Sequence, residues 1–94
     1  MNAESRPRPN GHVSWELVEE AAVVVDPSEG NVYHFNAVGT EIWKALDGIR
    51  TIEEIVGHVQ ACFEVKQAKI RKDVLSFIKQ LRDMDLVSEQ TSHE

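Results

Sequence analysis

The sequence predicts an α+β domain in which a three-stranded antiparallel sheet is followed by three helices. Between residues 13 and 35 the large apolar residues are mostly β-branched or aromatic and occur in short runs, which is typical of strands. From residue 36 to about residue 85 they recur every three or four positions, which is typical of amphipathic helices. Strands followed by helices indicate a small sheet packed against a helical layer.

The strands are expected at residues 13–18, 21–25 and 32–35. A dense run of turn-forming residues from Asp26 to Asn31 predicts that the second and third strands form an antiparallel hairpin. The middle run is continuously apolar, as in a central strand, whereas the third mixes polar and apolar residues, as in an edge strand.

The first helix is expected at residues 37–46, with Asn36 as its N-cap and a left-handed cap at Asp47 and Gly48. The second helix follows Thr51, which forms a capping box with Glu54. The third helix is expected at residues 67–85, and residues 86 and 87 add a short extended segment.

The ends of the chain are expected to lie outside the folded domain, which we assign to residues 12–89. Residues 1–11 contain two prolines, one glycine and no large apolar side chain except the first methionine, so we expect a disordered tail. Residues 90–94 are polar, and we expect them to form a second disordered tail.

Size, charge and cysteine content exclude several classes of protein. The chain has 94 residues, which allows one domain, and a net charge of −6, which argues against nucleic-acid or anionic-membrane binding through overall charge. One cysteine excludes an internal disulfide and a zinc site built on paired thiolates. No apolar run is long enough for a membrane span, and residues 1–11 are unlike a signal peptide. A reducing, cytoplasmic location fits these features.

Catalytic chemistry is not indicated. The four histidines form no i, i+4 pair, so we expect no metal site. Glu53 and Glu54 are adjacent, and adjacent helical positions point about 100° apart, which makes paired acid and base roles unfavourable. Cys62 precedes Phe63 and is interpreted as a small apolar filler. We therefore expect a protein that is not an enzyme and holds no cofactor.

Basic residues are concentrated in the third helix. Residues 66–82 contain six of the ten basic residues and one acid, so this window has a local charge of +5. A helical wheel at about 100° per residue places four of these basic residues on one shoulder, with a leucine among them and Ile78 at its border: Arg71, Lys72, Leu75, Lys79 and Arg82. The shoulder is either a solvated face or one wall of a groove for an acidic, partly apolar partner.

One longer motif resembles a known family. It comprises Tyr33, His34, Phe35, Asn36, Ala37, Val38, Gly39, Thr40, Glu41, Ile42 and Trp43, followed by Leu46, Asp47, Gly48 and Thr51. Asp73, Val74 and Leu81 match later positions of the same pattern. The chain resembles the PqqD-like proteins, named for the pyrroloquinoline quinone biosynthesis protein D and also called RiPP recognition elements, over roughly residues 13–89.

The resemblance implies a winged helix-turn-helix-like fold and a function in peptide binding. Such domains hold the leader of a ribosomally made precursor peptide as an added strand beside the third strand and against the third helix. They present it to a modifying enzyme, often a radical SAM protein. The expected peptide-binding residues are Asn31, Val32, Tyr33, His34, Phe35, Arg71, Leu75, Ile78, Lys79 and Arg82.

From the basic shoulder we expect an acidic leader. Leu75→Glu should then weaken binding strongly and Lys79→Glu mildly. The peptide product is expected to differ from pyrroloquinoline quinone, and the oligomeric state is left open.

Two other functions fit the same pattern of elements. A DNA-binding winged helix would use the basic helix for recognition. However, few residues follow Asp85 to form a wing, and the start of the basic helix has a low density of side chains that read bases. A structural subunit that docks on a larger enzyme through the basic shoulder is the other alternative.

Overall fold

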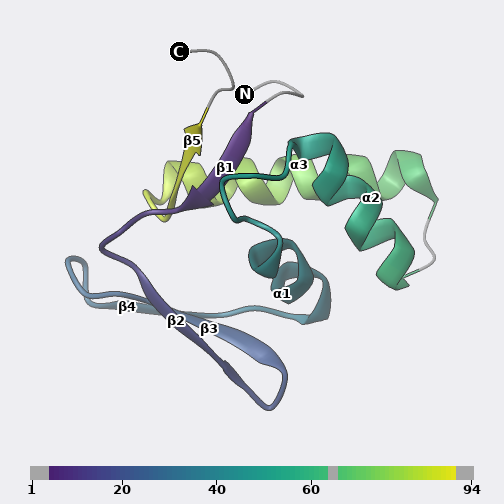
Figure 1. The fold of residues 1–94 in the computed structure, drawn as a ribbon. Helices are drawn as coiled ribbons and strands as arrows, with labels where there is room; N and C mark the ends of the chain where they lie inside the picture. Colours follow the sequence, from purple (N-terminus) through teal and green to yellow (C-terminus); the bar gives the residue numbers. More distant parts are fainter. Residues whose placement is uncertain (1–4, 64–65, 91–94) are drawn as a thin grey trace.

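The computed structural model describes residues 5–63 and 66–90 of the chain (Figure 1). Within these residues it has three helices and five strands in two antiparallel sheets. The elements are β1 (Arg6–Pro9), β2 (Ser14–Val18), β3 (Ala21–Asp26), β4 (Asn31–His34), α1 (Ala37–Lys44), α2 (Ile52–Phe63), α3 (Gln67–Asp83) and β5 (Val87–Gln90). The predicted fold class is confirmed. The tail positions 1–4 and 91–94 lie outside the described residues.

The larger sheet has the order β2-β3-β4, so the central position predicted for residues 21–25 is confirmed. Along β3 the side chains alternate, with Ala22, Val24 and Asp26 buried and the residues between them half-buried. Trp15 and Tyr33 stand opposite Val24 on either side. One face of the sheet therefore packs on the core beneath α1 (Figure 1), and the apolar run is not fully covered on both faces.

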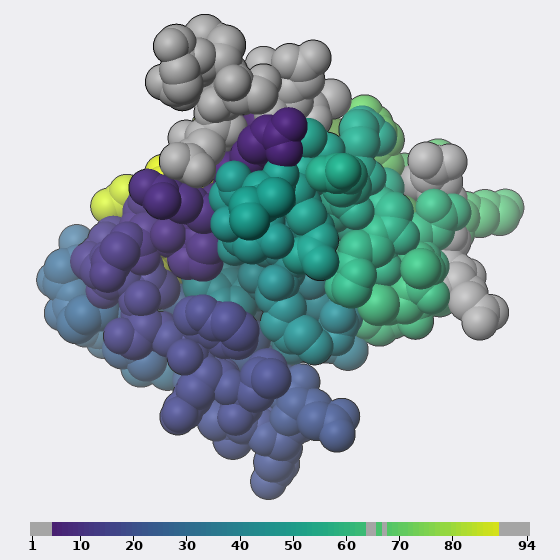
Figure 2. Space-filling view, in the orientation of Figure 1, coloured from purple at the N-terminus to yellow at the C-terminus, as the bar shows by residue number. Residues whose placement is uncertain are grey.

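The turn between β2 and β3 contains only Glu19 and Glu20, which have φ angles of 53° and 71°. Two central residues with positive φ are typical of a type I′ turn, which matches the twist of the strands it joins. The turn sets Val18 opposite Ala21. This hairpin projects from the body of the molecule (Figure 2).

The prediction of a disordered N-terminal tail is wrong for residues 6–9, because this segment forms strand β1 and pairs with β5. Proline normally argues against a paired strand, since it lacks an N–H donor. Here the N–H of Asn10 donates to Leu86 O, and the N–H of Gly48 donates to Pro7 O on the other side. Because backbone groups alternate along the strand, the N–H and C=O groups of Arg6 and Arg8 point toward β5, and those of Pro7 and Pro9 point away from it. The pairing between the two strands therefore loses no N–H donor.

The helix starts are as predicted, and two helix ends differ. The third helix, α3, ends at Asp83, two residues before its predicted end. Asn36 Oδ1 accepts from Gly39 N at 2.8 Å and caps α1. Thr51 and Glu54 exchange the two hydrogen bonds of the capping box. However, α1 ends at Lys44, two residues early, with its C-cap in a right-handed conformation. Gly48 is left-handed, with φ 76°, but lies in the loop that follows.

A single apolar core joins the sheet to the helices. It is built from β3, all three helices and the segment that enters β5. Its fully buried large side chains are Trp43, Ile42, Ile52, Ile55, Ile70, Ile78, Leu81, Leu86, Val24, Val56, Val59 and Val74. The ring of Trp43 makes edge-to-face contacts with Trp15 and Phe35. No described helix is long and apolar enough to cross a membrane.

Thr40 connects α1 to the sheet, and removing its side-chain hydroxyl should measurably lower the stability of the fold. Its buried Oγ1 accepts a hydrogen bond from Ala22 N at 2.9 Å. Thr40→Val leaves that buried N–H without its acceptor, so we expect the free energy of unfolding to fall by about 1–3 kcal/mol. Urea unfolding followed by circular dichroism measures the change. Thr40→Ser keeps the oxygen and is the control; a serine variant less stable than the valine variant would contradict this assignment.

Candidate functional site

Strand β4 lies at an edge of the larger sheet, and one hydrogen bond fixes which of its backbone groups face outward. The N–H of Phe35 donates to Ala22 O on β3 at 3.0 Å. Because backbone groups alternate along an antiparallel strand, Asn31 and Tyr33 also face β3. Val32 and His34 then direct their N–H and C=O groups away from the sheet. In the described part of the chain no strand pairs with this edge.

The flank of α3 that lies nearest to the end of β4 carries Phe77. The rings of Phe77 and Phe35 pack edge to face, with centroids 5.2 Å apart. Gly39 permits this approach, since a β-carbon there would lie 3.2 Å from Phe77 Cζ. A cavity of about 270 Å³ lies at this junction, lined by Asn36, Val38, Gly39, Ile42, Asp73 and Phe77.

The basic shoulder of α3 lies on the opposite side, so the predicted juxtaposition with β4 is wrong. Leu75 and Lys79 are each two positions from Phe77, which places them about 200° around the helix from it. Arg71 forms an ion pair with Glu53 of α2, which turns this shoulder toward α2. The hydrophobic stripe located the core side of α3 but could not distinguish the flank facing the sheet from the flank facing α2.

The predicted site residues thus separate into two groups. Asn31, Val32, Tyr33, His34 and Phe35 form β4 and its end, as expected. Arg71, Leu75, Ile78, Lys79 and Arg82 do not join them in one groove. Ile78 is 0% exposed and belongs to the core. Lys79 pairs with Asp83 at 3.3 Å on an exposed face, and Arg82 lies in the last turn.

Three residues that the sequence reasoning did not assign to the site take the place of the shoulder. Asp73 is four positions before Phe77 and Gln80 is three positions after it, so all three lie along one side of α3. Asp73 had a signal, since it matched the family pattern together with Val74. This flank carries an amide and the acid Asp73, which pairs with Lys69 at 3.1 Å, rather than a basic cluster, so the geometry does not favour an acidic leader.

A second group of polar side chains lies across α1 from this junction. Glu41 of α1 meets His58 and Cys62 of α2. Cys62 is exposed, so its interpretation as an apolar filler is wrong. A hydrogen bond from Lys44 holds the pKa of Glu41 below its usual value; partial burial opposes this shift and His58 adds to it.

Comparison with known protein families agrees with this architecture. The family model for coenzyme PQQ synthesis protein D (PqqD) matches residues 21–87, from the central strand to the start of β5. The chain belongs to the PqqD family. The match spans β3, β4 and all three helices of this PqqD-family chain, and it confirms the family resemblance carried by residues 33–51.

Two solved structures are similar to this PqqD-family chain. One is TbiB1 in complex with the TbiA(beta) leader peptide: TM-score 0.79, 23% identity, 86% of this chain and 94% of that chain covered. The other is lasso peptide synthetase B1 complexed with the leader peptide: TM-score 0.79, 14% identity, 88% and 98% covered. At these identities the likeness shows the fold. Comparison with curated proteins gives no significant match.

Proposed function

We propose that this chain binds the leader segment of a ribosomally made precursor peptide and presents it to a modifying enzyme, without catalysing a step itself. The leader would add as a strand along β4 and lie against the Phe77 flank of α3. The observation that carries the proposal is the open edge of β4 beside that flank. Membership of the PqqD family supports it, and both similar structures are complexes with leader peptides.

Backbone pairing alone would give too little affinity. Val32 and His34 offer four outward-facing backbone groups, and each hydrogen bond contributes about 0.5–1.5 kcal/mol net. A micromolar complex requires about 8 kcal/mol. The leader must therefore bury apolar side chains as well, and the half-buried rings of Tyr33, Phe35 and Phe77 are placed to receive them. Near Asp73, whose carboxylate pairs with Lys69 at 3.1 Å, we expect a polar leader residue.

The partner enzyme and the cellular location are parts of the same proposal. The sequence resemblance favours a radical SAM enzyme, whereas one structural neighbour is named a lasso peptide synthetase. We retain the radical SAM partner as the prediction that a co-purification with the enzymes encoded nearby would test. A cytoplasmic location suits a precursor made by ribosomes and a chain with one free thiol.

The test is a titration with the leader of a precursor encoded beside this chain, measured by calorimetry and by backbone-amide NMR. We expect a dissociation constant in the micromolar range or lower and shifts in β4 and along the Phe77 flank. His34→Pro removes an outward N–H while sparing the pairing with β3, so binding should weaken at least about tenfold, the equivalent of one good hydrogen bond.

The matched control is Leu17→Pro on the opposite edge. Glu16 and Val18 face β3, so the N–H of Leu17 also points away from the sheet. Equal weakening by both proline variants would contradict binding at β4. Shifts confined to the Leu75 side of α3 would also contradict it. A nucleic-acid ligand would instead show affinity that falls steeply with salt.

A further inference from the structure

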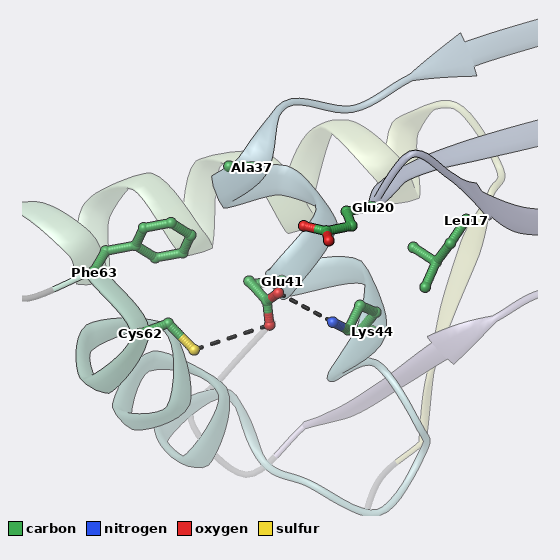
Figure 3. Close-up of a pocket in the computed structure, with 7 residues that line it drawn as sticks. All are labelled: Leu17, Glu20, Ala37, Glu41, Lys44, Cys62 and Phe63. Carbon is green, nitrogen blue, oxygen red and sulfur yellow. Dashed lines mark hydrogen bonds and ion pairs between the residues drawn. The ribbon is translucent and has the colours of Figure 1, made fainter.

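Three side chains with metal-binding atoms converge between α1 and α2. Glu41 Oε1 lies 3.2 Å from His58 Nε2. Cys62 Sγ lies 3.9 Å from each of these two atoms. His58 and Cys62 are one turn apart on α2, and Glu41 approaches from α1, with Cys62 Sγ directed at its carboxylate (Figure 3). All three donor atoms lie within 4.8 Å of one another.

These separations resemble those around a tetrahedral ion. Zinc binds oxygen, nitrogen and sulfur at about 2.0–2.3 Å, which puts neighbouring ligand atoms about 3.3–3.7 Å apart. The observed distances of 3.2 and 3.9 Å require adjustments of only a few tenths of an ångström. In a proton relay, the thiol would instead lie at one imidazole nitrogen and the carboxylate at the other. Here both groups approach the same nitrogen.

The surroundings also suit an ion. Lys44 Nζ binds the other carboxylate oxygen of Glu41 at 3.1 Å, which orients Oε1 toward His58 and Cys62. A cavity of about 350 Å³ opens beside Glu41 and Cys62 and would leave a fourth position to water. The His58 side chain is 37% exposed and that of Glu41 23%, so an ion could reach the donors without unfolding.

We propose that Glu41, His58 and Cys62 bind one divalent transition-metal ion, with zinc as the best fit to a thiolate, an imidazole and a carboxylate. The thiol would bind as thiolate and release one proton to solvent. Thiolate and carboxylate would supply two negative charges against the two of the ion, and the ammonium of Lys44 would leave the cluster with one net positive charge. The ion would join α1 to α2. This site shares no residue with the junction of α3 and β4 and goes beyond the proposed function.

The test uses tag-free protein titrated with Co²⁺ as an optical probe and then with Zn²⁺ in competition. We expect the protein to bind one equivalent of Co²⁺ and to show a sulfur-to-cobalt charge-transfer absorption band. Cys62→Ser should abolish this band. Cys62→Ser, His58→Gln and Glu41→Gln should each weaken zinc binding by at least about tenfold, because altering a residue that only hydrogen-bonds to a metal ligand already costs about tenfold to a hundredfold. His12→Gln and Glu16→Gln are the matched controls and should bind as the unaltered chain does.

Thermal unfolding gives a second readout. At a hundredfold excess of Zn²⁺ over the dissociation constant of the unaltered chain, Tm should rise by at least about 10 °C in that chain and by no more than about half as much in Cys62→Ser, whose affinity is at least about tenfold lower. Cobalt spectra without the thiolate band, or equal zinc affinity in Cys62→Ser and the unaltered chain, would overturn the site. Leader binding by Cys62→Ser, measured in parallel, separates this outcome from failure of the proposed function.

Discussion

Replacing Trp43 with alanine is expected to lower the free energy of unfolding by about 3–5 kcal/mol, a large part of the roughly 5–15 kcal/mol that stabilises a typical domain. Trp43 is 1% exposed, and its ring contacts Trp15 and Phe35 at centroid distances of 6.1 and 5.6 Å. The substitution removes these contacts and leaves a cavity between α1 and the sheet. Urea unfolding followed by far-ultraviolet circular dichroism measures the loss.

Two variants serve as controls for this prediction. Trp43→Phe keeps an aromatic ring and removes an indole N–H that is buried without a partner among the described residues, so its cost should be much smaller. Trp15→Ala removes the other ring of the contact, but Trp15 is 40% exposed and should also cost less. If Trp15→Ala were as destabilising as Trp43→Ala, the assignment of Trp43 as the central core residue would be wrong.

The second large effect concerns the rotation of α3 about its axis. Ile78→Ala should destabilise the fold by about 2–5 kcal/mol, because Ile78 is 0% exposed. Leu75→Ala should cost less than about 1 kcal/mol, since Leu75 is 36% exposed and lies on the outer side of α3. The urea concentrations at the unfolding midpoints of the two variants give the difference in stability, provided that both unfold with the same m-value.

Leu75 and Phe77, on opposite sides of α3, test the corrected site. From the sequence we expected Leu75→Glu to weaken leader binding strongly, whereas the structure predicts little change, because Leu75 points away from β4. Phe77→Ala should weaken it, provided that circular dichroism confirms the native fold. Strong loss of leader affinity in Leu75→Glu with retained affinity in Phe77→Ala would restore the original orientation.

The order of the elements was predictable because local signals agreed with the final packing. Asn36, Thr51 and Glu54 are capping residues whose hydrogen bonds depend on neighbours three positions away. The hairpin between β3 and β4 depends on the turn residues at 26–31 in the same way. Each of these features is decided within a few residues, so the sequence alone contains the information.

The features that were missed depend on contacts between distant segments. The pairing of Arg8 with Ser88 joins residues that have no local pattern in common, and the two prolines of β1 argued against a strand. The flank of α3 that faces β4 is decided by the packing of Phe77 on Phe35. The meeting of Glu41 with Cys62 requires the angle between α1 and α2, which no spacing along one helix contains.

The ribbon of β1 and β5 has a consequence for the order in which the molecule folds. Its two strands are separated by nearly the whole described chain, so Arg6–Pro9 emerges from the ribosome long before Val87–Gln90 is synthesised. Until then the early segment has no strand to pair with, and closing so long a loop is slow compared with forming helices and hairpins. Completion of the ribbon is therefore expected to be a late step of folding.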